Sequence, residues 1–104
     1  MLRIYPVILE TIRILQPTIE RIQQRDPDLG RQMRRAASSI ALNVSEGSYS
    51  RGGNRQVRYH SALGSARETL ACLEVAAVLG YAPEVDDEMR NRFNTILGTL
   101  VTLV

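Results

Sequence analysis

Three arginines near the middle of the chain have the spacing of a phosphate-binding surface: Arg51, Arg55 and Arg58. A guanidinium group binds phosphate oxygens through two parallel N–H bonds, and residues three or four apart share one side of a helix. Two tyrosines interleave with them and offer rings on which nucleobases stack. With Arg3, the predicted RNA- or DNA-binding residues are therefore Arg3, Tyr49, Arg51, Arg55, Arg58 and Tyr59. A solvated, charged helix end is the alternative interpretation.

A second group of polar residues suggests a catalytic cluster at first sight: Asn43, Glu46 and His60. No nucleophile or oxyanion hole accompanies them, so a hydrogen-bonded structural patch is the better interpretation. His60 is the only histidine, and neither a cysteine partner nor a carboxylate cluster supplies the other ligands of a metal site. We therefore expect no enzyme activity, no metal and no cofactor.

The charge is distributed unevenly along the 104 residues, although the net charge is only +2. Residues 1–67 hold eleven arginines and five acidic residues, whereas residues 68–104 hold two arginines and six acidic residues. Such asymmetry favours a polyanionic partner without requiring one. Every basic residue is arginine, which fits either a preference for phosphate contacts or a GC-rich genome.

The length of the chain indicates one domain, residues 1–104. The single cysteine, Cys72, excludes an intramolecular disulfide and lies among aliphatic residues typical of a core. No convincing signal peptide is present, and no stretch approaches the roughly 18 uncharged apolar residues that span a bilayer. We therefore expect a cytoplasmic protein without membrane association.

Apolar residues recur every three or four positions along four segments, which predicts four amphipathic helices. The first contains Pro17, which predicts a kink, and the second runs from Pro27 to about Ser48 with Asp26 as its N-cap. Residues 48–54 form a loop, the third helix ends near Gly80, and Pro83 begins the fourth. Short connections predict an all-α, antiparallel up-down-up-down four-helix bundle.

The second and third helices carry facing rows of alanine, serine and glycine, which predicts unusually close packing between them. Antiparallel pairing about their loop places residues level when their numbers sum to about 103, so Ser39 faces Gly64 and Ser38 faces Ser65. The same register predicts two structural polar pairs, Arg35 with Glu68 and Asn43 with His60.

This topology gathers the loop and both chain ends at one end of the bundle, together with Arg3, Arg51, Arg55 and Arg58. The first and fourth helices also carry more apolar residues than a single contact within the bundle can bury, which predicts self-association. The expected interface residues are Ile4, Val7, Ile14, Leu97, Val101 and Val104. A closed ring of copies repeats the arginine-bearing end around its axis.

Two blocks of the sequence resemble the signature of the four-helix-bundle proteins encoded in 23S rRNA intervening sequences. The first is Gln32 to Ile40 followed by Asn43-Val44-Ser45-Glu46-Gly47, and the second comprises Ala62 to Glu68 and Ala76 to Tyr81. The family also includes the accessory variability protein of diversity-generating retroelements, a homopentamer that binds nucleic acid and a reverse transcriptase. The resemblance implies a small bacterial, cytoplasmic, non-enzymatic bundle that forms a homopentamer.

Two functions follow as hypotheses. The first is an oligomeric scaffold that binds RNA or DNA through backbone phosphates at the loop end. The second is a protein-interaction adaptor without direct nucleic-acid contact, in which the apolar surface or the acidic residues from Glu84 to Glu88 bind a partner such as a polymerase or reverse transcriptase.

Overall fold

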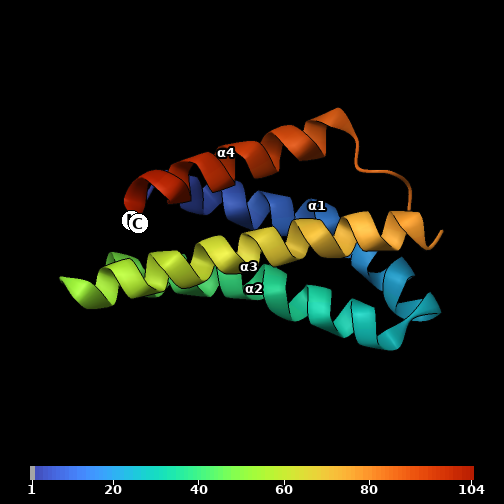
Figure 1. Ribbon diagram of the computed structural model, residues 1–104, viewed down its shortest axis with the longest axis horizontal. Helices are drawn as coiled ribbons and strands as arrows, with labels where there is room; N and C mark the ends of the chain where they lie inside the picture. Colours follow the sequence, from blue (N-terminus) through green and yellow to red (C-terminus); the bar gives the residue numbers. More distant parts are fainter. Residues whose placement is uncertain (1) are drawn as a thin grey trace.

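The computed structural model describes residues 2–104, which form four α helices and no strand (Figure 1). The helices are α1 (Ile4–Arg25), α2 (Pro27–Ser48), α3 (Gly53–Val78) and α4 (Asp87–Leu103). The colours in Figure 1 show that each helix runs back along its predecessor, which gives the predicted up-down-up-down bundle. The bundle is elongated, with extents of 43 × 26 × 19 Å.

The α1–α2 connection is the tight turn that the sequence predicts. The Asp26 carboxylate accepts a hydrogen bond from the Leu29 amide at 3.0 Å, and Pro27 occupies the first helical position, where no amide donor is needed. Gly30 then allows α2 to approach α1 closely, because a Cβ added there would lie 2.4 Å from the Cβ of Gln23. The turn therefore brings the two backbones together.

The end of α3 is a Schellman motif around Gly80, which has a φ of +77°. The Tyr81 amide donates to the Ala76 carbonyl and the Gly80 amide to the Ala77 carbonyl, so the last carbonyls of α3 are satisfied. The predicted C-terminal signal at Gly80 is confirmed.

The start of α4 differs from the prediction that placed Pro83 at its first position. The helix begins at Asp87, because the Asp86 carboxylate caps it by accepting from the Met89 amide at 2.8 Å. Asp87 and Glu88 follow in the first turn, where negative charge is favourable. Residues 79–86 therefore form a longer connection than predicted, visible as the thin coil between α3 and α4 in Figure 1.

The seam between α2 and α3 is the most extensive helix–helix contact of the bundle. Buried alanines line it from both helices, namely Ala36, Ala37, Ala41, Ala62 and Ala66. The Ser65 hydroxyl donates to the Ser39 hydroxyl at 2.8 Å across this seam, one residue from the predicted register. Gly64, predicted to face Ser39, instead lies on the exposed side of α3, with nothing within 4 Å of an added Cβ.

Large aliphatic side chains fill the interior in two clusters. The cluster nearer the α2–α3 loop contains Ile8, Ile40, Val44, Ile96 and Leu100, among others. The cluster nearer the other end contains Ile19, Ile22, Met33 and Phe93, and it includes the buried Cys72. Both clusters consist of apolar side chains, and the candidate arginines Arg3, Arg51, Arg55 and Arg58 lie at the surface.

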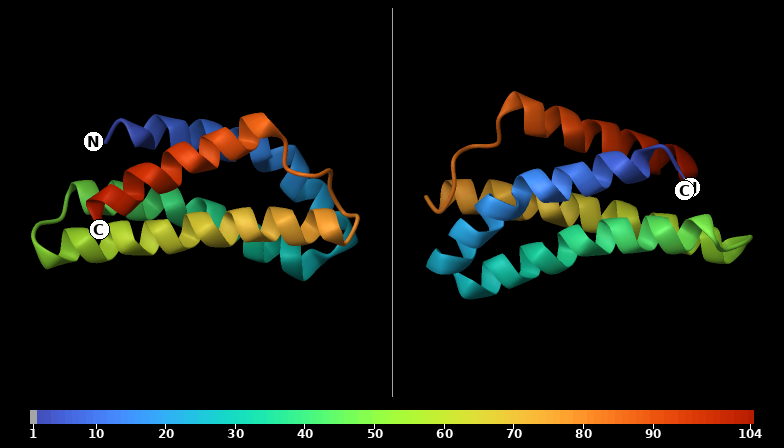
Figure 2. Two further views of the ribbon diagram at one scale, coloured as in Figure 1. Left: turned by 45° about the horizontal axis from the view of Figure 1, so that its top comes forward. Right: turned by 180° about the vertical axis from the view of Figure 1, so that it is seen from behind.

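The first helix remains continuous through Pro17. Figure 2 shows that α1 changes direction in its second half, as the predicted kink requires. The bend lets α1 follow both α4 and α2 along the length of the bundle.

Candidate nucleic-acid interface

One end of the bundle gathers the α2–α3 loop, the start of α1 and the end of α4, as predicted (Figure 2). The loop comprises only residues 49–52, and Gly52 makes it possible by adopting a φ of +58°. The first residues of α3 follow at once, so arginines of the loop and of α3 share this end.

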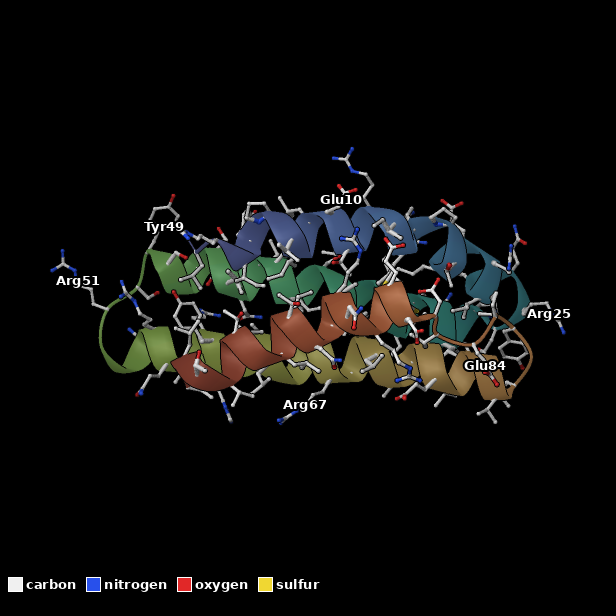
Figure 3. All side chains as sticks on the ribbon, turned by 90° about the horizontal axis from the view of Figure 1, so that it is seen from above. Glu10, Arg25, Tyr49, Arg51, Arg67 and Glu84 are labelled. Carbon is white, nitrogen blue, oxygen red and sulfur yellow. The ribbon has the colours of Figure 1, made fainter. Side chains whose placement is uncertain are left out.

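Arg51 is the outermost of the candidate arginines. Its side chain extends away from the loop tip, and Tyr49 points outward beside it (Figure 3). The Arg55 Nε donates to the Ser50 carbonyl at 3.0 Å, which holds the side chain against the loop while the residue stays exposed. Within residues 2–104, no carboxylate lies within ion-pair distance of Arg3, Arg51 or Arg55.

Arg58 differs from the other candidates because it already has an anionic partner. Its Nη2 lies 3.1 Å from the Glu46 carboxylate, so the pair bridges α3 and α2 beside the loop. Both side chains are about half exposed, and such surface pairs contribute little stability. The ion pair nonetheless reduces the charge that Arg58 offers a polyanion.

The two tyrosines of the predicted interface lie in opposite environments. Tyr49 is 81% exposed, whereas Tyr59 is 4% exposed. Tyr59 packs its ring against Gly47, where an added Cβ would lie 2.5 Å from the ring edge. The prediction that Tyr59 stacks on bases is therefore wrong, since its ring fills the small-residue seam.

Neither predicted polar pair forms. Arg35 and Glu68 are both exposed, and no ion pair joins them, because the observed register places them on the outer sides of their helices. The Asn43 amide donates to the carbonyl and the hydroxyl of Ser39, each at 2.9 Å, within α2. His60 faces solvent instead of Asn43.

His60 lies in an open groove that the sequence analysis did not predict. The groove has a volume of about 330 Å³ and is lined by Gln56, Val57, His60, Ser61 and Val104. Four of these residues come from one side of α3, at spacings of four residues, and the fifth comes from the end of α4. The spacing was visible in the sequence, but the approach of α4 was not.

The predicted self-association residues divide into three groups. Ile4 is 5% exposed and belongs to the core, so its predicted place on a surface interface is wrong. Val7 and Leu97 are partly buried against the same core. Ile14, Val101 and Val104 remain exposed on α1 and at the end of α4.

The opposite end of the bundle holds charges of both signs. Arg25 and Glu84 mark it in Figure 3, and the Arg25 guanidinium lies 5.3 Å from the centre of the Tyr81 ring. That distance suits a cation–π contact, which ties the end of α1 to the α3–α4 connection. Within residues 2–104, Arg21 and Arg25 also lack a carboxylate partner, but Asp26, Asp28 and the acidic residues from Glu84 to Glu88 share this end, so its charge is mixed.

Cys72 is a core residue rather than a reactive thiol. Burial raises the pKa of its thiol, and the negative charge of Glu68 raises it further. A raised pKa keeps the sulfur protonated and weakly nucleophilic.

The described part of the chain contains no group of three or more histidine, cysteine or acidic residues able to hold a metal ion. None of its helices is long and apolar enough to cross a membrane.

Comparison with known proteins identifies a family that the chain matches. Residues 10–102 match the family described as 23S rRNA-intervening sequence protein. No curated protein and no solved structure matches the chain. Because the match spans nearly the whole sequence, the chain belongs to the 23S rRNA-intervening sequence protein family.

Proposed function

We propose that this protein is a non-enzymatic, oligomeric helical scaffold that binds the phosphate backbone of RNA or DNA at its α2–α3 loop end. The observation that supports it is that Arg51 and Arg55 are exposed there and have no carboxylate partner among residues 2–104. Arg3 adds a further cation at the start of α1, and Tyr49 adds an exposed ring. Family membership in a group of rRNA-intervening sequence proteins is compatible with such a role.

Self-association strengthens the positive electrostatic potential of the loop end, which is weak in a single copy. The net charge of +2 is too small for a single copy to attract a polyanion strongly. A closed ring repeats the loop-end arginines around its axis and focuses their potential. The exposed Ile14, Val101 and Val104 supply apolar area for contacts between copies, and five copies is the number that the family resemblance implies.

Binding to fluorescently labelled RNA and DNA at increasing salt tests this proposal. With Arg3, Arg51 and Arg55 each on one phosphate, counterion release predicts a roughly twentyfold or greater loss of affinity between 50 and 200 mM salt. The double variant Arg51→Glu with Arg55→Glu is expected to weaken binding at least about tenfold.

A charge-matched variant controls for net charge alone. Arg21→Glu with Arg35→Glu also changes the net charge from +2 to −2, but it alters exposed residues away from the loop. This control is expected to bind much more tightly than the loop variant. Equal loss in both variants, or no binding by the native protein at low salt, contradicts the proposal.

A second candidate function is a protein adaptor, and the apolar residues at the far end of α3 favour it. Val75, Val78 and Leu79 are exposed there, and Val78 is 87% exposed. Glu84, the first residue of the acidic segment that ends at Glu88, lines a surface pocket together with Val78. A partner captured from host extract by the native protein after nuclease treatment, but not by Val78→Glu, would support an adaptor.

A further inference from the structure

The groove beside the loop-end arginines has the lining of a site for a planar, polar ligand. Val57 and Val104 supply apolar walls, while Gln56, His60 and Ser61 supply an amide, an imidazole and a hydroxyl. Apolar or aromatic contact with a ring face, together with hydrogen bonds to its edge, is how proteins hold unpaired bases. A purely apolar contact between protein copies does not need three polar side chains.

Charge along the outer side of α3 favours a nucleic-acid strand as the source of that ligand. Arg51, in the loop, and Arg55, in the first turn of α3, precede the groove residue Gln56 along the chain. Arg67 follows the groove residues, seven residues and about 10 Å beyond His60 on the same side of the helix. Figure 3 shows the Arg67 side chain extending away from α3, and within residues 2–104 it has no ion-pair partner.

Gly64 leaves the helix surface bare between the groove and Arg67. An added Cβ there would meet nothing within 4 Å, so packing within one copy does not explain a residue that weakens a helix. A glycine at this position lets a ligand approach the backbone of α3 closely.

We infer that the groove lined by Gln56, Val57, His60, Ser61 and Val104 receives an unpaired nucleobase of a single strand whose phosphates contact Arg51, Arg55 and Arg67. The inference rests on the proposed function and specifies it, because it makes the preferred ligand single-stranded. The imidazole of His60 stacks on the base, and Gln56 and Ser61 bond to its edge.

Two oligonucleotides with the same backbone test the inference on the full-length protein. One is a fluorescein-labelled twelve-nucleotide thymidine strand, and the other carries abasic sites in place of every base. The native protein is expected to bind the thymidine strand about fivefold to a hundredfold more tightly, the range for stacking of one base. His60→Ala with Gln56→Ala is expected to lower that affinity to the abasic level while leaving abasic binding unchanged.

Two control variants keep the outcomes distinct. His60→Phe retains a stacking ring and is expected to recover most of the preference, whereas Gln24→Ala, exposed on α1, is expected to change nothing. Equal binding of both strands by the native protein overturns the inference and leaves the proposed function standing. Failure to bind either strand also overturns the inference, and the proposed function is then decided separately by its own titration with labelled RNA and DNA.

The remaining alternative occupant is a second copy of the chain, since Val104 also belongs to the expected self-association surface. Light scattering of His60→Ala with Gln56→Ala separates the two cases. An unchanged oligomeric state with lost base preference supports the nucleobase. A changed oligomeric state with the base preference retained overturns it.

Discussion

Gly47 and Gly64 occupy helices for opposite reasons, and exchanging each for alanine separates them. A Cβ at Gly47 would lie 2.5 Å from the Tyr59 ring, so Gly47→Ala is expected to lower the free energy of unfolding by about 1–3 kcal/mol through overpacking. Gly64 has open space, so Gly64→Ala is expected to raise it by about 0.5–1 kcal/mol. Urea denaturation followed by circular dichroism measures both, and equal effects at the two sites contradict the account of the seam.

Individual side chains on α3 were the hardest part to predict from the sequence. Tyr59 and His60 are adjacent, and one residue along a helix turns a side chain by 100°. The prediction placed Tyr59 in the interface and His60 inside, whereas the structure buries Tyr59 and exposes His60. Periodicity identifies a helical face, but the direction of the neighbouring helices decides which edge of that face is buried.

The start of α4 depends on one capping side chain, which makes it testable at the scale of the helix. Asp86→Ala removes the acceptor of the Met89 amide and is expected to lower the free energy of unfolding by about 1 kcal/mol. Asp87→Ala, one residue later and exposed, removes a favourable charge only and is expected to cost a few tenths of that. Thermal unfolding of the two variants measures the difference, and equal costs would show that Asp86 does not cap the helix.

The ends of α1, α2 and α3 were predicted from nearby capping and turn residues. Asp26 with Pro27 and the glycine at position 80 were read correctly, because each satisfies backbone groups within a few residues of itself. The start of the fourth helix was predicted at Pro83, which is wrong, because α4 begins at Asp87 with Asp86 as its N-cap. The Asp86 carboxylate accepts from the Met89 amide, one of the first-turn amides that have no carbonyl partner within the helix.

Charge is distributed unevenly along the molecule, with arginines predominating at the α2–α3 loop end and charges of both signs at the other end (Figure 3). The sequence predicted this arrangement because helix order and loop lengths decide which residues share an end. The groove beside His60 was missed because it forms only where α4 ends against α3, a long-range contact.

Self-association is the property of the whole molecule on which a strong polyanion surface depends. Val101, exposed near the end of α4, is the residue whose replacement tests it most directly. Sedimentation of the native protein is expected to give a mass several times that of the 11.6 kDa chain. Val101→Glu is expected to shift the protein toward the single chain, because a carboxylate buried between copies loses its hydration without a partner.

Val78→Glu is the matched control, since it introduces the same charge at a valine even more exposed, at the opposite end of the bundle. It is expected to leave the sedimenting mass unchanged. At equal protein concentration, Val101→Glu is also expected to bind RNA or DNA more weakly than Val78→Glu, because dissociated copies no longer present several arginine sets to one strand. A native protein that sediments as a single chain, or a Val101→Glu variant indistinguishable from Val78→Glu, would remove the oligomeric part of the proposed function and leave the arginines of one copy to act alone.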